Sequence, residues 1–210
     1  QTHAVIGDRA YADRPEPVAA LGRAAAEGLL AEGVMPVIKH IPGHGRATVD
    51  SHEALPRVTA SRAELERTDF VPFKLLSDLP WAMTGHLLFD AIDPRDCITV
   101  SAGAVQDVIR SHIGFDGLLL SDDLSMQALG GSLGERAARA LAAGCDIALH
   151  CNGRMAEMVE IAGRSGSMTE RAHRRFQDGR SFLARHRDPA GARGLADAAR
   201  RVAELLPEWG

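Results

Sequence analysis

The strongest β-strand signal in the chain is GLLLSDDLSM, at residues 117–126. Three consecutive leucines without a polar interruption are typical of a strand that is buried on both faces of a parallel sheet. Two carboxylates, Asp122 and Asp123, follow this apolar run directly. We therefore expect a buried strand over residues 117–121 that ends at Asp122, with charged groups at its carboxyl end.

Three further strand-like segments flank this stretch, and helix-like segments separate them. The strands are expected at residues 34–40, 81–88 and 145–150. Strands that alternate with helices indicate an α/β protein with a parallel sheet.

The expected helices follow from residues that start or stop a helical turn. Pro15 or Pro17 opens the first helix and Gly33 stops it, because proline is favoured in the first turn and glycine just past the last one. Further helical stretches are expected from Ser61 with a break near Pro72, from Ser101 as a cap, over residues 134–143, and from Arg154, Thr169 and Gly191 onward.

The number of strands limits the architecture. A complete (β/α)8 barrel takes about 250 residues, whereas this chain has 210 residues and four recognisable βα units. Four parallel strands cannot close a barrel, and they leave two unpaired edges and an uncovered apolar face. We therefore predict an α/β fold of the (β/α)8 TIM-barrel type, of which this chain contains about the C-terminal half. The open barrel edges also predict self-association.

Domain organisation and composition narrow the class of protein. We expect a single domain over residues 1–210, with a helical C-terminal extension from about residue 153 to residue 210. Apolar side chains make up 45% and charged side chains 25% of the chain, which is typical of a globular protein. The net charge of −4 argues against a nucleic-acid partner. The apolar runs stay below the roughly 18 residues of a membrane span, so we expect no membrane partner.

The cysteines and the first residue bear on where the protein works. Cys97, Cys145 and Cys151 are odd in number and lie in apolar or strand-like contexts, which favours a reducing compartment. We therefore expect a cytoplasmic protein. Because the chain opens on Gln1 rather than Met, we expect its true N-terminus to lie further upstream.

Polar residues follow all four predicted strands: Lys39 and His40, then His86, then Asp122 and Asp123, then His150 and Asn152. The carboxyl edge of a parallel sheet or barrel is where active sites are built. We expect these side chains to form a site.

The densest group of reactive side chains lies in KHIPGHG at residues 39–45 and in DSH at residues 50–52. Lys39 is one of only two lysines in the chain, which indicates more than a solubilising role. Asp50 can fix the tautomer of His52 and raise its basicity, so that His52 can transfer protons. An Asp-x-His pair that only stabilises a loop is the alternative, and geometry has to distinguish the two.

A zinc site is the second interpretation of this group. His40, His44, Asp50 and His52 carry donors that zinc accepts. Pro-Gly separates His40 from His44, so these two residues cannot share a helix face as in a His-x-x-x-His site. We therefore expect no metal.

Asp122 and Asp123 allow two interpretations. A carboxylate at the end of a buried strand is desolvated unless something binds it, which makes it a candidate nucleophile or electrostatic stabiliser. Alternatively, Asp123 or Ser125 caps the following helical segment.

Arginines near both ends of the chain also allow two interpretations. Arg9, in Gly7-Asp8-Arg9, can bind a substrate hydroxyl or carboxylate, or form a surface ion pair. The Arg-rich residues after Cys151 are interpreted as a solvated helical face.

The stretches KHIPGHG, DSH and FDGLLLSDDLSM resemble the signature motifs of the β-N-acetylhexosaminidases of glycoside hydrolase family 3. Supporting stretches are residues 6–9, 81–93 and 143–146. Within the family, the chain most resembles the cytoplasmic β-N-acetylglucosaminidases of peptidoglycan recycling. The similarity runs from about residue 5 to residue 152.

This resemblance implies a (β/α)8-type barrel and a retaining double displacement without a cofactor. It implies that Asp122 is the nucleophile and that His52, assisted by Asp50, is the acid/base. Lys39, His40 and Arg9 match positions that hold an N-acetylglucosamine unit of the saccharide substrate, whereas His44 shapes the loop. An imidazole and a carboxylate can together provide the proton transfers and the nucleophile of such a mechanism.

Two alternatives remain. The absent half barrel would make the chain a catalytically silent sugar-binding or assembly module. The substrate's own acetamido group can also act as the nucleophile, with the adjacent carboxylates orienting it.

Overall fold

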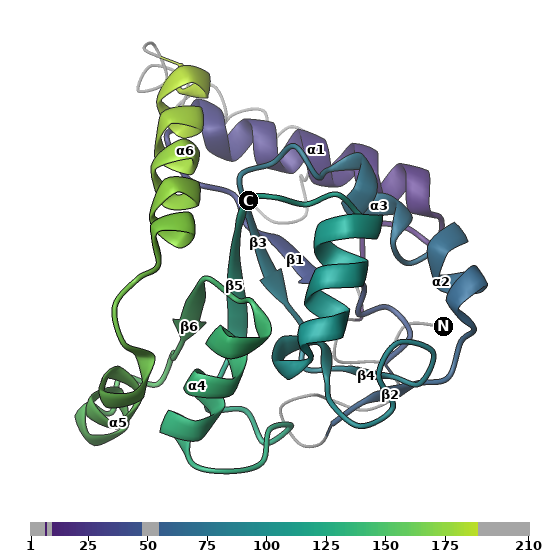
Figure 1. Cartoon of the computed structure of the whole chain (residues 1–210). Coiled ribbons are helices and arrows are strands. Elements are labelled where there is room, and N and C mark those ends of the chain that lie inside the picture. The colour runs from purple at the N-terminus through teal and green to yellow at the C-terminus, as the bar shows by residue number, and fades with distance from the viewer. Residues whose placement is uncertain (1–6, 8–9, 48–54, 189–210) are drawn as a thin grey trace.

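A four-stranded parallel sheet forms the centre of the computed structural model, which describes residues 7, 10–47 and 55–188 (Figure 1). Its strands are β1 (Ile38–Ile41), β3 (Trp81–Thr84), β5 (Leu118–Asp123) and β6 (Ile147–Leu149). Their order is β1-β3-β5-β6, and every neighbouring pair is parallel. The predicted α/β fold with a parallel sheet is therefore confirmed.

A second, two-stranded parallel sheet joins β2 (Arg57–Val58) to β4 (Leu88–Phe89). The prediction of one strand over residues 81–88 was wrong at its end, because the chain leaves the main sheet after Thr84. Leu88 pairs with Arg57 instead of continuing β3. Gly85 and His86 thus lie between two sheets, at the carboxyl end of β3.

Two strands begin later than predicted, and for the same physical reason. Gly33 and Gly144 both take positive φ angles at helix ends, as a helix-terminating glycine does. The next residue donates back to the helix in each case, Val34 N–H to Leu29 O and Cys145 N–H to Ala140 O. These residues therefore belong to the helix caps, and the strands start only at Ile38 and Ile147.

Eight helical segments are described: α1 (Pro15–Ala31), α2 (Arg62–Arg67), α3 (Val71–Leu75), the 3-10 helix η2 (Ile98–Val100), the π-helix η3 (Ala104–His112), α4 (Leu133–Ala143), α5 (Met155–Ser165) and α6 (Glu170–His186). The predicted caps are confirmed, since Ser61, Ser101 and Thr169 each accept a main-chain N–H three residues on. The break near Pro72 is also confirmed. The stretch from Gly191 lies outside the described residues.

The core lies on one face of the sheet. Ile38, Ala82 and Leu119 are aligned across β1, β3 and β5 and are buried with side chains of the helices. The next row, Lys39, Met83, Leu120 and Ile147, points to the opposite face because side chains alternate along a strand. All four residues of that row are at least partly exposed.

A buried ion cluster holds the amino end of the sheet. Asp146 accepts hydrogen bonds from Leu119 N–H at 2.9 Å and from Arg110 at 3.0 Å, and Arg175 lies 3.1 Å away. These three charged side chains are no more than 10% exposed. Arg175 therefore corrects the prediction that the C-terminal arginines only form a solvated face, because its guanidinium ties α6 to the body of the domain.

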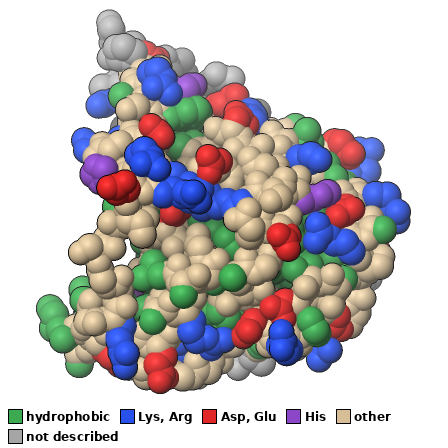
Figure 2. Space-filling model, viewed as in Figure 1, with side chains coloured by type: hydrophobic (Ala, Val, Ile, Leu, Met, Phe, Trp, Pro, Cys, Tyr) green, Lys and Arg blue, Asp and Glu red, His purple; other side chains and the backbone are tan. Residues whose placement is uncertain are grey.

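Helix α6 covers the amino end of the opposite face of the sheet, the face that points away from the core. The Trp81 ring stacks on Phe176 with centroids 5.7 Å apart, and Gly179 leaves room for the indole. Figure 2 shows hydrophobic side chains at the surface over α5, where Met155, Met158 and Val159 are exposed. Among the described helices, none combines the length and the apolar character that crossing a membrane requires.

Candidate active site

The carboxyl ends of the four strands bring the predicted polar residues together, as a parallel sheet must. His40 from β1 lies beside Asp122 from β5, although β3 separates the two strands. His86 follows β3 and contacts Asp123, and His150 follows β6 and faces the same aspartate. The sequence prediction that these strand ends share one region is confirmed.

Two irregularities in the sheet occur at the central residues of this edge. The β1–β3 register shifts between Lys39 and Ile41, which leaves His40 as the extra residue. The β5–β6 register shifts between Leu120 and Asp123, across the position of Asp122. A β-bulge re-aims a side chain that a regular strand would point elsewhere. The shifts explain why residues of two non-adjacent strands can face each other.

The His40 imidazole is neutral near pH 7. Its Nε2 lies 3.7 Å from Oδ2 of Asp122. Burial lowers the pKa of His40 to about 4, and the positive charge of Lys39 adds to this effect, while the Asp122 charge opposes it. Because the ring is uncharged, the contact is a dipole facing a carboxylate and not an ion pair.

Asp122 and Asp123 have different surroundings. Asp122 is 8% exposed, and its Oδ1 accepts the main-chain N–H of Asp123 at 2.9 Å. Its second oxygen faces His40. The Asp123 carboxylate instead accepts Ser125 N–H at 3.0 Å, Ser125 Oγ–H at 2.6 Å and Cys151 N–H at 3.2 Å. Asp123 therefore stabilises the turn after β5, and the expectation that Asp123 or Ser125 caps a helix was wrong, because the next helix, α4, begins at Leu133 with Ser132 as its N-cap.

These hydrogen bonds also determine the charge of Asp123. Burial raises the pKa of its carboxyl, but the bonds from Ser125 and Cys151 outweigh burial and hold the pKa below its usual value. Hydrogen bonds that favour the charged form act in this direction. Asp123 is a fixed anion whose oxygens are already occupied.

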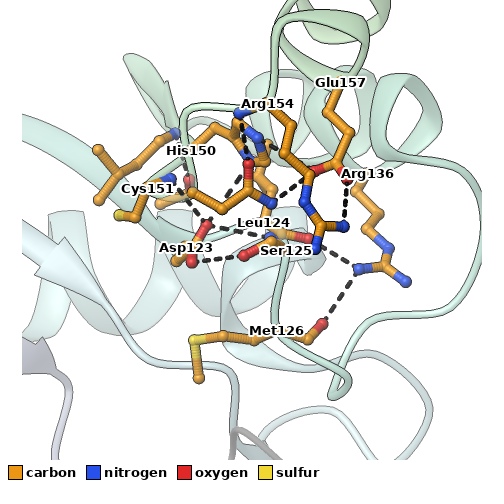
Figure 3. Close-up of polar contacts among 12 residues, drawn as sticks. Asp123, Leu124, Ser125, Met126, Arg136, His150, Cys151, Arg154 and Glu157 are labelled. Atoms are coloured by element: carbon orange, nitrogen blue, oxygen red, sulfur yellow. Dashed lines mark hydrogen bonds and ion pairs between the residues drawn. The ribbon is translucent and has the colours of Figure 1, made fainter.

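Asp123 lies in a polar network of which the sequence analysis named His150 but missed Arg136 and Glu157 (Figure 3). The His150 side chain is 6% exposed, with Nδ1 3.8 Å from Asp123 and Nε2 3.2 Å from Glu157. Arg136 of α4 donates to the carbonyl oxygens of Leu124 and Met126, at 2.7 Å and 3.1 Å. Arg136 and Glu157 lie inside helices, and the residues next to them in the sequence do not indicate that they contact the loop after β5 or His150.

The approach of β3 to the loop after β1 requires a glycine. A Cβ atom on Gly85 would lie 3.1 Å from Cβ of His40 and 3.7 Å from Cδ2 of His44, and it would overlap Leu87. The His40 and His44 rings lie 5.2 Å apart between their centroids. His44 thus packs beside His40, in agreement with the loop-shaping role expected for it.

The other predicted site residues fall into two groups. Lys39 is exposed on β1, aligned with Met83 on the face that points away from the core. Arg9, Asp50 and His52 lie outside the described residues, so their roles stay predictions. Within the described ranges, the His, Cys, Asp and Glu side chains form no group of three that could hold a metal ion.

Comparison with known proteins supports the resemblance inferred from the motifs. The family model for the glycosyl hydrolase family 3 N-terminal domain matches residues 1–176. A β-hexosaminidase of Alkalilimnicola ehrlichii is 45% identical over 152 residues, which cover 70% of this chain and 43% of that protein. A β-hexosaminidase of Pseudomonas aeruginosa is 39% identical over 165 residues, or 77% of this chain and 49% of that protein. The chain thus spans about half the length of these curated relatives.

Solved structures show the same relationship. The structure of NagZ from Neisseria gonorrhoeae in complex with N-trifluoroacetyl-D-glucosamine is 36% identical with a TM-score of 0.75, over 84% of this chain and 51% of that one. A family 3 β-N-acetylglucosaminidase from Paenibacillus sp. is 32% identical with a TM-score of 0.74, over 88% of this chain and 37% of that one. With its sequence motifs, its fold and the family match in agreement, the chain belongs to glycosyl hydrolase family 3, whose N-terminal domain it matches.

Proposed function

We propose that the chain carries the catalytic edge of a retaining β-N-acetylhexosaminidase that removes terminal β-linked N-acetylglucosamine. The observation that carries this proposal is the Asp122 carboxylate at the end of β5, with Oδ1 held by a main-chain N–H and Oδ2 facing neutral His40. A buried, oriented carboxylate beside an uncharged donor is suited to nucleophilic attack on a sugar. The β-hexosaminidase relatives support the class of reaction.

The first step forms a covalent glycosyl-enzyme. An Asp122 oxygen attacks the anomeric carbon, and the glycosidic bond breaks as its oxygen takes a proton from His52. Asp50 orients His52 and stabilises the charge of its imidazolium form. Lys39, His40 and Arg9 hold the N-acetylglucosamine unit, and the neutral His40 ring can exchange hydrogen bonds with a sugar hydroxyl without competing for the charge of Asp122.

The second step releases the sugar with retained configuration. Water gives its proton to His52 and its oxygen attacks the anomeric carbon, which breaks the ester bond to Asp122. The carboxylate is then restored. The occupied oxygens of Asp123 favour this path over attack by the acetamido group, because the second carboxylate of the pair is not free to orient that group.

The architecture proposed for this enzyme is a (β/α)8 barrel of which the chain contains about the C-terminal half. The row Lys39, Met83, Leu120 and Ile147 on the open face would then line the barrel interior. Within the described sheet, β1 and β6 have a neighbour on one side only. These edges support self-association, which light scattering over a range of protein concentrations would detect as a mass above 22.4 kDa.

The substrate and compartment follow from the same proposal. The natural substrates would be peptidoglycan fragments with a terminal N-acetylglucosamine, processed in the cytoplasm during cell-wall recycling. Cys97, Cys145 and Cys151 are all free thiols, which supports a reducing compartment.

The test is the intact mass of the 210-residue chain after incubation with 5-fluoro-N-acetylglucosaminyl fluoride. This reagent allows the glycosyl-enzyme to form and slows its breakdown. We expect a mass increase of one sugar that maps to Asp122, absent in Asp122→Asn and present in Asp123→Asn. A chain that binds N-acetylglucosamine without labelling would instead support the catalytically silent module.

A further inference from the structure

His86 is the most enclosed histidine at the carboxyl edge of the sheet, and no role has been assigned to it above. It is completely buried, so it cannot reach a substrate. Both ring nitrogens have partners: Nδ1 lies 2.8 Å from Oγ1 of Thr99, and Nε2 lies 3.0 Å from the carbonyl oxygen of Asp123. The ring therefore links the 3-10 helix η2 to the residue next to Asp122.

The chemistry of these partners determines the tautomer of His86. A carbonyl oxygen only accepts, so Nε2 must carry the hydrogen that bonds to Asp123. Burial lowers the pKa of His86, against the opposing effect of the Asp122 charge, so the ring is neutral. Nδ1 must then accept, and the Thr99 hydroxyl donates to it at 2.8 Å in preference to the Gly85 carbonyl oxygen, which lies 3.3 Å away and competes for the same hydrogen.

Thr84 is linked to Thr99 in the same way. Since the Thr99 hydroxyl gives its hydrogen to His86, it accepts the hydrogen of the Thr84 hydroxyl, 2.8 Å away. Thr84 and Thr99 are both fully buried. The result is a chain of hydrogen bonds with one direction, from Thr84 through Thr99 and His86 to the Asp123 carbonyl. Such a buried chain orients its last member more strictly than a solvated one would.

Asp123 transmits this orientation to Asp122. Its carbonyl is held by His86, its carboxylate by Ser125 and Cys151, and its N–H points at Oδ1 of Asp122. We propose that His86 is a positioning residue, which keeps the Asp122 carboxylate in its reactive orientation by holding the main chain of Asp123. The inference rests on the proposed function for the catalytic role of Asp122, whereas the link from His86 to Asp123 can be measured without turnover.

The first measurement is the hydrogen-exchange rate of the Asp123 amide, which NMR can detect in the full chain. In His86→Leu we expect exchange to become about tenfold faster, because the hydrogen bond that holds the residue is lost. The Leu119 amide, on the same strand but bonded to Asp146, should change less than about twofold. His86→Gln can place an amide N–H near the position of Nε2 and should restore most of the protection.

Two further variants keep the test decisive. Thr99→Val retains the ring but removes the donor to Nδ1, so it should give a smaller change in the same direction. It replaces His86→Leu in the test if that variant does not fold. His112→Leu, a ring on η3 that lies against Phe70, is the matched control and should leave the Asp123 amide unchanged. Unchanged exchange in both His86→Leu and Thr99→Val, or a ring whose ¹⁵N shifts show the hydrogen on Nδ1, would overturn the proposal.

The second measurement is the rate at which 5-fluoro-N-acetylglucosaminyl fluoride labels Asp122. His86→Leu should lower the maximal labelling rate about tenfold while leaving the half-saturating reagent concentration nearly unchanged, because orientation is lost and not sugar binding. An equal rate in wild type and His86→Leu would contradict the positioning role. Absence of labelling in the wild type would contradict the proposed function instead, and the exchange experiment would still decide whether His86 holds Asp123.

Discussion

His40 and Asp122 face each other across the carboxyl edge of the sheet, with Nε2 of the imidazole 3.7 Å from Oδ2 of the carboxylate. They come from β1 and β5, which β3 separates, and each lies where the register of its strand shifts. A neutral ring beside a carboxylate is thus built from two bulges in an otherwise regular sheet. This arrangement has consequences for stability as well as for chemistry.

The buried His40 should make the protein sensitive to acid. Its pKa is lowered from 6.5 to about 4 by burial, so between these values the unfolded chain binds more protons than the folded chain. The free energy of unfolding should therefore fall as the pH is lowered, by about 2 kcal/mol between about pH 7.5 and about pH 5 from this residue.

Urea unfolding of wild type and His40→Gln at the two pH values measures this contribution. The variant should lose less stability on acidification, by the same amount. His86, whose pKa burial also lowers, is present in both proteins, so its effect cancels in the comparison. Parallel pH profiles for the two proteins would show that His40 does not titrate as expected.

Substitutions of the two adjacent aspartates should differ in their effect on the free energy of unfolding. Asp123→Ala removes the acceptor of hydrogen bonds from Ser125 and Cys151, and should lower the free energy of unfolding by about 2 kcal/mol. Asp122→Asn keeps an oxygen that can accept Asp123 N–H and should cost less than about 1 kcal/mol. Urea unfolding of both variants checks this order, and the reverse order would mean that Asp122 is the structural member of the pair.

Gly85→Ala should disturb the site directly. The added methyl group would meet His40 and Leu87 in a closely packed region, with an expected loss of about 1 to 3 kcal/mol. Gly28→Ala in the interior of α1 is the matched control, because a Cβ there meets nothing within 4 Å. That change should stabilise the protein by about 0.5 to 1 kcal/mol through helix propensity. Thermal unfolding of the two variants should therefore move in opposite directions.

Asp146→Ala should be the most destabilising of these changes. It leaves the buried guanidinium groups of Arg110 and Arg175 without their shared partner, with an expected loss of about 3 to 5 kcal/mol. Arg23→Ala breaks the exposed pair with Asp78 and should cost at most about 1 kcal/mol. If urea unfolding gave similar losses for both variants, the cluster at the amino end would contribute no more than a surface ion pair.

Much of the fold could be predicted because its signals are local. Each of these signals influences only residues a few positions away in the chain. Examples are the leucine run of β5, the capping residues Ser61, Ser101 and Thr169, and the helix stop at Gly33. The alternation of such segments is enough to indicate a parallel sheet, and a parallel sheet brings polar strand ends to one edge.

The sequence by itself therefore determined the four strands of the main sheet, most of the helices between them, and which strand ends carry reactive side chains. Only the tertiary structure decided the pairing of Arg57 with Leu88, the burial of Arg175, and the different hydrogen-bond partners of Asp122 and Asp123. Each of these depends on partners far away in the chain. The charge and orientation of a buried group depend on the atoms that surround it, and those atoms come together only when the chain folds.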